Sequence, residues 1–401
     1  MRRRRQAKGW EALQLPLNWQ GTGAILLDEA FPRLYNGMHK KSGTLVLAHR
    51  TPPNQDGGTS SIMISRNPTA SPTYPQDWSN YNLAQQSEKG RFLVLLRDLC
   101  GTIPQPPQTK GRPRLPLADM LFSATYKVYS GFSSRRFTTD IQVARRDGLI
   151  DHAPHFNTVS NYLADPALTP LLKSLIELSA SPLKAVETDF AADSTGFSTA
   201  SYDRWFDHKW GKVKSRHRYI KTHLMCGVQT NIVTAVEATA GESADSPQLP
   251  ALLDTTTETF DVQEVSADKA YSSKRNHRAI EAAGATGYIP FKANSTPTQG
   301  HHRFDGLWSR MWHYYNFQRD DFSAHYHKRS NVETTMAMIK SNFGGSVKSK
   351  SAEAQVNEVL CKILAHNICV LIQSLYELGI ESEFCTKTPP VAQKVSYLRL
   401  I

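Results

Sequence analysis

The sequence predicts an α/β fold, in which a mixed sheet flanked by helices is preceded by a mainly helical region. Three observations predict it. Residues 115–180 space their apolar side chains as helices do, and from residue 185 the pattern changes to short alternating strands. A long apolar helix then follows near the C-terminal end. Strands that alternate with helices are typical of a sheet covered by helices.

Composition divides the chain into four regions. Residues 1–75 combine an arginine run with a stretch rich in Pro, Gly and Ser, which predicts a disordered or linker-like segment. Residues 76–180 form the expected helical, DNA-binding domain. Residues 181–380 form the expected catalytic domain, and residues 381–401 form a tail. Met63 is an alternative start, and N-terminal peptide mapping that finds the arginine run would exclude it.

The helical region carries its own boundary signals. "LADMLFSATYKVYSG" ends at a glycine, "SSRRFTTDIQVARRDG" begins with serine caps, and "FNTVSNYLAD" begins with an Asn/Thr cap. Short helices joined by turns, with arginines among them, predict a helix-turn-helix-like DNA reader. Helices that only pack within a larger domain remain the alternative. The preceding "KGRPR" fits either an arm that enters a minor groove or a solvated linker.

Beyond residue 185 the order of elements is readable. "YIKTHLMCGVQT" and "NIVTAVEATAG" predict paired strands, "SPQLPALLDTTTETF" a helix and "VQEVSADKAY" a strand. A helix, "SSKRNHRAIEAAG", and a strand, "TGYIPFK", come next. "SAEAQVNEVLCKILAHNICVLIQSLYELG" predicts a long helix that closes a layer of the core.

The charge favours a polyanionic partner. The chain of 401 residues has 47 Lys and Arg against 36 Asp and Glu, a net charge of +11 and a pI near 9.3. An anionic membrane is the weaker choice, because the most apolar run is interrupted by Lys362, His366 and Asn367. Five scattered cysteines without a C-x-x-C pair indicate a reducing compartment and no disulfide framework.

Acidic residues on two strands and one helix suggest a metal site. In "ETDFAADSTGF" a strand places Glu187, Asp189 and Asp193 on one side. Asp268 follows a strand that leads into a helix, which is where open α/β sheets place their sites. With Glu333 from a helix, oxygen ligands of this kind suit Mg²⁺ or Mn²⁺ and can hold two ions for attack on a phosphodiester.

The segment "HYHKRSNVETTMAMIKSNFG", residues 325–344, has two stripes when drawn as one helix. Four polar residues share one face, and apolar residues form a stripe beside it. The polar stripe consists of Tyr326, Arg329, Glu333 and Lys340, and the apolar stripe of Val332, Met336, Ile339 and Phe343. An ordinary amphipathic helix with solvated charges is the plainer interpretation.

These residues resemble those of a known family. The Tyr-x2-Arg-x3-Glu-x6-Lys spacing is similar to that of bacterial insertion-sequence transposases of the DDE class. "ADSTGF" resembles their first-aspartate strand, and "SADKAYSS" resembles their second-aspartate motif. The resemblance covers about residues 185–378 and, more loosely, the helical region from about 115.

The resemblance implies a ribonuclease H-like core and a DNA transposase that cuts transposon ends and transfers them into target DNA. It implies Asp193, Asp268 and Glu333 as catalytic residues that hold Mg²⁺, with Mn²⁺ as a substitute. Arg329 and Lys340 would contact phosphates of the transposon end. Double-stranded DNA, a homodimer in the synaptic complex and a bacterial, nucleoid-associated cytoplasmic location are the expected partners and setting.

Several points stay open at this stage. Tyr326 would stack on or hydrogen-bond to DNA near the cut, while Asp189 rivals Asp193 because both face the same way. The aromatic and basic insertion near 293–324 predicts either a stacking surface for DNA or an apolar mini-core. The segment "KWGKVKSRHRYIK" predicts a phosphate-tracking hairpin, with a solvated loop as the alternative. The hairpin's predicted DNA contacts are Lys212, Lys214, Arg216, Arg218 and Lys221.

Two other functions compete with transposition. A transposase derivative that binds DNA without cutting would need no acidic cluster facing a polyanion. A stand-alone metal-dependent nuclease would share the three carboxylates but would not rejoin ends. Strand transfer from a 3′-hydroxyl distinguishes a transposase from such a nuclease.

Overall fold

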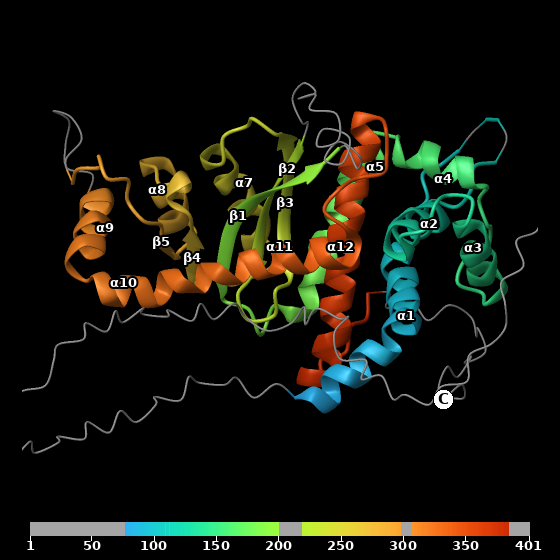
Figure 1. The fold of residues 1–401 in the computed structure, drawn as a ribbon, viewed down its shortest axis with the longest axis horizontal. Coiled ribbons are helices and arrows are strands. Elements are labelled where there is room, and N and C mark those ends of the chain that lie inside the picture. Colours follow the sequence, from blue (N-terminus) through green and yellow to red (C-terminus); the bar gives the residue numbers. More distant parts are fainter. Residues whose placement is uncertain (1–76, 109, 112, 200–218, 298–305, 385–401) are drawn as a thin grey trace, which may run out of the picture. The chain divides into compact units, whose positions relative to one another are not determined.

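The computed structural model describes residues 77–384, apart from residues 109, 112, 200–218 and 298–305. The predicted linker-like N-terminal region, including Met63, and most of the C-terminal tail lie outside the described residues. Figure 1 shows the order of the elements along the chain.

The first part of the described chain is helical, as the spacing of apolar residues predicts. Its helices are α1 (Trp78–Gly101), α2 (Leu117–Ser130), α3 (Phe137–Arg146), α4 (Phe156–Leu163) and α5 (Leu168–Ala180). Helix α2 ends at Gly131, whose φ of 67° is the left-handed conformation that glycine adopts without a steric penalty. Helix α1 begins at Asp77, whose carboxylate accepts hydrogen bonds from the amides of Ser79 and Asn80.

Within the described residues, five strands form one mixed sheet in the order β3-β2-β1-β4-β5. The strands are β1 (Asp189–Ser198), β2 (Tyr219–Gly227), β3 (Val233–Ala240), β4 (Glu264–Ala267) and β5 (Thr286–Tyr288). The first three pair antiparallel, and β4 and β5 add in parallel to β1. This mixed sheet, with its flanking helices and the helical region before it, confirms the predicted α/β class.

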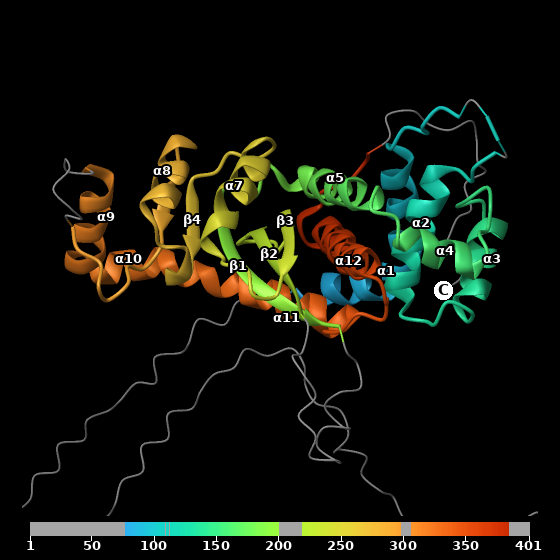
Figure 2. The same ribbon diagram turned by 90° about the horizontal axis from the view of Figure 1, so that it is seen from above.

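Helices cover both faces of the sheet. The remaining helices are α7 (Leu249–Thr257), α8 (Lys274–Ala282), α9 (Gly306–Phe317), α10 (Arg319–Tyr326), α11 (Ser330–Phe343) and α12 (Ala352–Leu378). Figure 2 shows α10 and α11 along one side of the sheet and α7 and α8 along the other. The side chains of β1 alternate accordingly, because Ala191 and Phe197 pack into the core beneath α11, whereas Phe190 and Ala192 pack toward α7 and α8.

Helix α12 joins the helical region to the sheet. Its side chains share one apolar core with α1, α2, α5 and β3, so the helices on either side of residue 180 bury the same apolar surface. By length and composition, α12 is apolar enough to cross a membrane, but 78% of its most apolar window is buried inside the protein. Its apolar character is therefore explained by the core. The predicted domain boundary near residue 180 stays a prediction.

Candidate functional site

Two of the expected carboxylates lie at neighbouring positions of parallel strands. Asp193 is on β1, and Asp268 directly follows β4. The register pairs Ala192 with Ala267, so the next residues along the two strands, Asp193 and Asp268, continue side by side. Two strands that are far apart in the sequence thereby bring two acidic groups to one edge of the sheet.

The third expected carboxylate reaches this edge from α11. Glu333 lies in the first turn of that helix, and its side chain is 59% exposed. Arg329 lies between the acidic groups: its guanidinium nitrogens are 2.7 Å from the Asp193 carboxylate and 2.9 Å from the Glu333 carboxylate. One cation thus bridges the strand and the helix.

The Asp193 carboxyl group is only partly solvated. Burial raises its pKa, and this effect is opposed by a 2.8 Å hydrogen bond from the Ser194 amide and by the positive charge of Arg329. The charge of Asp268 raises the pKa of Asp193 further, which shows that the two carboxylates are within electrostatic range. Two like charges held together at a half-buried edge favour a bound cation.

Tyr326 belongs to the same electrostatic group. Burial raises the pKa of its phenol, Arg329 lowers it, and the charges of Asp268, Asp193 and Glu333 raise it. The phenol therefore stays protonated at neutral pH and keeps a hydroxyl that can donate a hydrogen bond.

Lys340 lies on the same face of the sheet, beside Thr195, which is two residues beyond Asp193 on β1. Its ammonium is 2.6 Å from the Thr195 hydroxyl and lies over the Phe197 ring, at 5.6 Å from the ring centroid. Burial lowers its pKa. In the described part of the chain, Lys340 has no carboxylate partner, so its charge remains available for an anion.

The four residues of the polar stripe do not lie on one continuous helix. Tyr326 ends α10, a short 3-10 turn covers His327–Arg329, and Glu333 and Lys340 are on α11. The sequence contains no glycine or proline there that signals this break. The predicted apolar stripe is buried as expected at Val332, Met336 and Ile339, with Phe343 packed against it.

An ionic cluster holds this turn on the sheet. The Lys328 ammonium is 2.7 Å from both the Asp189 and the Glu264 carboxylates, and His325 Nδ1 is 2.8 Å from the other Glu264 oxygen. The ring of His325 also stacks on Tyr288, at 4.5 Å between centroids. These contacts connect β1, β4 and β5 to the turn that carries Arg329.

The two rival aspartates have different partners. Asp189 forms an ion pair with Lys328, whereas Asp193 forms one with Arg329 and is within electrostatic range of Asp268. Glu187 is fully buried and accepts hydrogen bonds from Thr230 and from the Gln229 amide, so it supports the turn between β2 and β3. Neither Glu187 nor Asp189 lies at the carboxylate edge.

Asp193, Asp268 and Glu333 have the donor chemistry of a site for a hard divalent cation. In the described part of the chain, however, no three His, Cys, Asp or Glu side chains are close enough together to hold a metal ion. The guanidinium of Arg329 instead donates to both Asp193 and Glu333. The space accepts a positive charge, and a metal ion would compete with Arg329 for it.

Most of the predicted basic hairpin lies outside the described residues, including Lys212, Lys214, Arg216 and Arg218. Lys221 is described: its ammonium is 2.7 Å from the Asp245 carboxylate and 2.9 Å from the Ser243 carbonyl oxygen. Lys221 would have to exchange these partners to contact a phosphate.

The aromatic insertion contains a small core. Trp308 and Met311 of α9 are buried against Phe291, and the indole nitrogens of Trp308 and Trp312 donate to the carbonyl oxygens of Thr296 and Ser295. Phe317 at the end of α9 is 77% exposed. The mini-core is therefore present, and an exposed aromatic side chain remains beside it.

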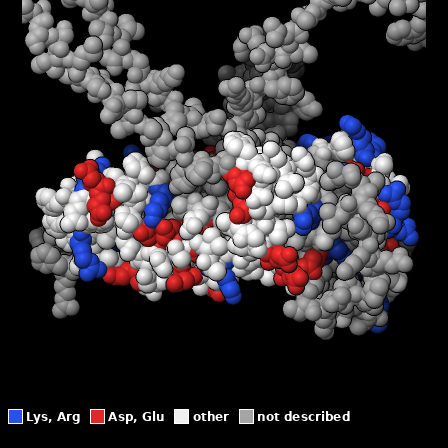
Figure 3. Space-filling view, turned by 90° about the horizontal axis from the view of Figure 1, so that it is seen from below, with Lys and Arg blue, Asp and Glu red and all other residues white. Residues whose placement is uncertain are grey.

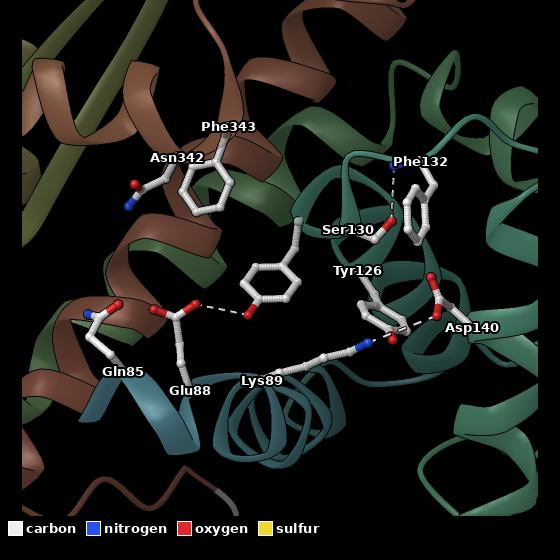
Figure 4. Close-up of a pocket in the computed structure, with 10 residues that line it drawn as sticks. Gln85, Glu88, Lys89, Tyr126, Ser130, Phe132, Asp140, Asn342 and Phe343 are labelled. Carbon is white, nitrogen blue, oxygen red and sulfur yellow. Dashed lines mark hydrogen bonds and ion pairs between the residues drawn. The ribbon is translucent and has the colours of Figure 1, made fainter. Parts of the chain in front are cut away.

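A separate hollow of about 400 Å³ lies between α1, α2, α3 and the end of α11 (Figure 4). Its acidic groups have partners: Glu88 accepts from the Tyr129 hydroxyl at 2.9 Å, and Asp140 lies 4.0 Å from the Lys89 ammonium. Its lining includes Phe343, which is about 15 Å along α11 from Glu333. This hollow is not part of the carboxylate site.

Among the described residues on the face shown in Figure 3, acidic side chains lie between separate lysines and arginines. Three polar residues beside the carboxylates were not predicted from the sequence, namely Asp245, Lys269 and Lys292, which line a hollow with Asp268. Each follows a strand directly or within a few residues, a signal that could have located Lys292 and Asp245 as it located Asp268.

Part of the chain is similar to a known protein family. Residues 184–368, a little under half of the chain, match the family described as the transposase DDE domain. The matched region begins just before β1 and ends within α12, so it includes Asp193, Asp268 and Glu333. This match supports a DDE-type transposase.

Among solved structures, the chain is similar to the piggyBac transposase in a synaptic complex with hairpin DNA, resolved by cryo-electron microscopy. The two are 10% identical, the match covers 73% of this chain and 74% of that chain, and the TM-score is 0.35. A score of that size carries no argument about this chain.

Proposed function

We propose that this protein is a DNA transposase of the Tyr-Arg-Glu-Lys branch of the DDE class, from a bacterial insertion sequence. It cuts DNA at the transposon ends and transfers the freed ends into target DNA. One observation carries the proposal: Asp193 and Asp268 continue two parallel strands side by side, and Arg329 connects Asp193 to Glu333, within the region that matches the DDE family.

The core is proposed to be ribonuclease H-like. The mixed sheet supports this, because its central strand β1 carries the first aspartate and the parallel neighbour β4 leads into the second. Two acidic groups therefore come from the rigid part of the fold, and only the glutamate comes from a helix that packs on it.

Asp193, Asp268 and Glu333 would hold Mg²⁺, with Mn²⁺ as a substitute. When bound, the metal would activate the attacking oxygen and stabilise the leaving one. The protein's own part is to orient these carboxylates: the Ser194 amide holds Asp193 at 2.8 Å, and the Lys269 amide holds Asp268 at 2.7 Å. Asp268 thus keeps its other oxygen available, whereas the second oxygen of Asp193 is held by Arg329 until a metal ion displaces it.

Arg329 and Lys340 would bind phosphates of the transposon end. Arg329 has a planar guanidinium suited to phosphate oxygens, and it would move from its carboxylate partners to the DNA. Lys340 would exchange the neutral Thr195 hydroxyl for a phosphate. Tyr326, in the same group, would hydrogen-bond to or stack on DNA near the cut.

Double-stranded DNA is the proposed partner, and two DNA ends held together call for a homodimer. The basic segment from Lys212 to Lys221 is proposed to track the phosphate backbone. The exposed Phe317 of the insertion is proposed to stack on an unpaired base. The expected setting is the bacterial cytoplasm, in association with the nucleoid.

A DNA-binding derivative that no longer cuts is the second candidate. It is favoured by one observation, because Arg329 already neutralises both Asp193 and Glu333 in this structure. In such a protein the carboxylates would serve to hold α11 on the sheet.

Cleavage of a labelled transposon-end duplex in Mg²⁺ tests the two candidates. The end sequence is taken from the repeats that flank the gene. The proposal expects wild-type protein to cut and the Asp193→Asn and Asp268→Asn variants to bind without cutting. Binding without cutting by the wild type would favour the DNA-binding derivative, and cutting without joining would favour a stand-alone nuclease.

A further inference from the structure

A second hollow lies against the proposed catalytic carboxylates. It encloses about 620 Å³, and Asp268 forms part of its wall. Its other lining residues come from the segments that follow β3, β4 and β5: Ala244, Asp245, Ser246, Lys269, Ala270, Lys292 and Ala293. Its position beside Asp268 makes it a candidate for contact with whatever substrate reaches that carboxylate.

Strand directions explain why these segments meet. Strands β4 and β5 run parallel to β1, and β3 also runs in this direction because it is antiparallel to β2. The carboxyl ends of all four strands therefore lie at one edge of the sheet, where open α/β proteins place ligand sites.

The hollow lies on the other side of the carboxylates from α11. Ser246 and Lys269 lead into the helices α7 and α8, which cover the opposite face of the sheet from α11 (Figure 2). Arg329 and Lys340 thus approach the carboxylates from one face, and the hollow opens toward the other. A DNA strand that crosses the carboxylates would meet both.

The charges of the lining suit a phosphodiester backbone. Lys269 and Lys292 are exposed, and neither forms an ion pair in the described part of the chain. The carboxylate of Asp245 is neutralised by Lys221 at 2.7 Å. Asp268 belongs to the proposed metal site, so the hollow offers the ammonium groups of Lys269 and Lys292 to an anion.

The shape of the lining allows a ligand to approach the backbone of the protein closely. Three lining residues are alanines, Ala244, Ala270 and Ala293, whose side chains leave the backbone open to a ligand. Lys269 is the first residue of a short 3-10 turn, and its amide donates to the carboxylate of the preceding Asp268. The position of Lys269 is therefore linked to that carboxylate. Small residues flanked by lysines fit a sugar–phosphate chain better than a compact apolar ligand.

We infer that this hollow binds the sugar–phosphate backbone of the DNA that lies beyond the scissile phosphate, through Lys269 and Lys292. This inference rests on the proposed function. Two sources of such a backbone exist in the reaction: the flanking DNA before the cut and the target DNA at the joining step.

The experiment uses the full-length chain and the Lys269→Ala/Lys292→Ala double variant. One arm measures cleavage of a transposon-end duplex that retains its flanking DNA, and another measures joining of a pre-cut end to a plasmid target. A loss of about tenfold in joining alone assigns the hollow to target DNA, and a similar loss in cleavage alone assigns it to flanking DNA. A loss in both assigns it to both, and unchanged rates in both arms overturn the inference.

Matched variants exclude a general effect of charge. Lys184 is an exposed lysine before β1, at the opposite edge of the sheet, so Lys184→Ala should leave both arms unchanged. Lys292→Arg, which keeps the charge, should keep the salt dependence of DNA binding, whereas Lys292→Ala should reduce it. Thermal unfolding should be unchanged in every variant, because these lysines are exposed.

A binding measurement separates this inference from the proposed function. The affinity for a duplex with flanking and target segments should fall with salt, and the slope of the logarithmic plot should be smaller by about 2 in the double variant. This result is independent of chemistry and would support the hollow even if the wild type did not cut. An unchanged slope would overturn the inference whatever the activity.

Discussion

The guanidinium of Arg329 lies 2.7 Å from the carboxylate of Asp193, at the position where a metal-binding carboxylate of β1 would face its ion. The same guanidinium reaches Glu333 at 2.9 Å. Arg329 therefore lies where the proposed metal ion would bind. In the proposed function, Arg329 exchanges these carboxylates for phosphates when the DNA binds.

Arg329→Ala should bind metal more tightly than the wild type. Removal of the positive charge next to Asp193 and Glu333 leaves both carboxylates available to a metal ion. Two opposite unit charges 4 Å apart attract each other by about 4 kcal/mol at an effective dielectric constant of 20. A fraction of this energy should raise the affinity for Mn²⁺ about tenfold. Electron paramagnetic resonance in the absence of DNA measures this affinity. Arg310→Ala, which removes an exposed arginine from α9, is the control. Equal affinity in wild type and Arg329→Ala would show that Arg329 does not compete with the metal.

Asp189→Asn and Asp193→Asn should have opposite effects. Asp189 pairs with Lys328 in the cluster that holds the turn before α11, so its loss should lower the free energy of unfolding by about 1 kcal/mol and leave cleavage measurable. Asp193→Asn should abolish cleavage with little loss of stability. Urea unfolding and the cleavage assay, run on both variants, check this. Abolished cleavage in a stable Asp189→Asn protein would place Asp189 among the catalytic residues.

Lys340→Met should weaken binding of the transposon end. Its ammonium has a neutral partner, Thr195, and is proposed to contact one phosphate. The expected result is a loss of affinity of about tenfold and a salt slope smaller by about 1. Thr195→Val removes the hydroxyl and keeps the lysine, so its slope should match the wild type. A fluorescence anisotropy titration at several salt concentrations measures both variants, and an unchanged slope in Lys340→Met would remove this residue from the DNA contacts.

His366 should make the protein sensitive to mild acid. Its imidazole is buried on α12, with Nε2 2.9 Å from the Asn231 carbonyl oxygen, and burial lowers its pKa to about 4. Between pH 6.5 and 4 the His366 imidazole binds a proton in the unfolded chain but not in the folded chain. The free energy of unfolding therefore falls as the pH falls through this window. His366→Gln should lose this contribution and show a flatter dependence. Parallel pH profiles of the unfolding midpoint for the two proteins would contradict the assignment.

Local patterns were sufficient for much of the fold. Alternation predicted β2 and β3, and the broad apolar face of "VNEVLCKILAHNICVLIQSL" predicted α12, because both signals depend on burial against a core. The 3-10 turn before α11 was not predictable, since the helical spacing of apolar residues continues across it without a glycine or proline.

The candidate site, like the fold, was predictable from the sequence only in part. The resemblance to the DDE class, together with strand position, was enough to propose Asp193, Asp268 and Glu333. The ion pair of Asp189 could not be predicted, because Lys328 bridges Asp189 and Glu264, which become neighbours only when β1 pairs with β4. Contacts of this kind depend on strand register, which no single segment of sequence specifies.

Cleavage and strand transfer by Glu333→Gln, measured beside the wild type, show whether Glu333 belongs to the active site. Glu333 is exposed on the first turn of α11, so the variant should fold and bind DNA normally. Wild-type protein should cut and join a labelled transposon end in Mg²⁺, and Glu333→Gln should bind the same DNA with neither activity. Equal cleavage by the two proteins would contradict it and remove Glu333 from the active site.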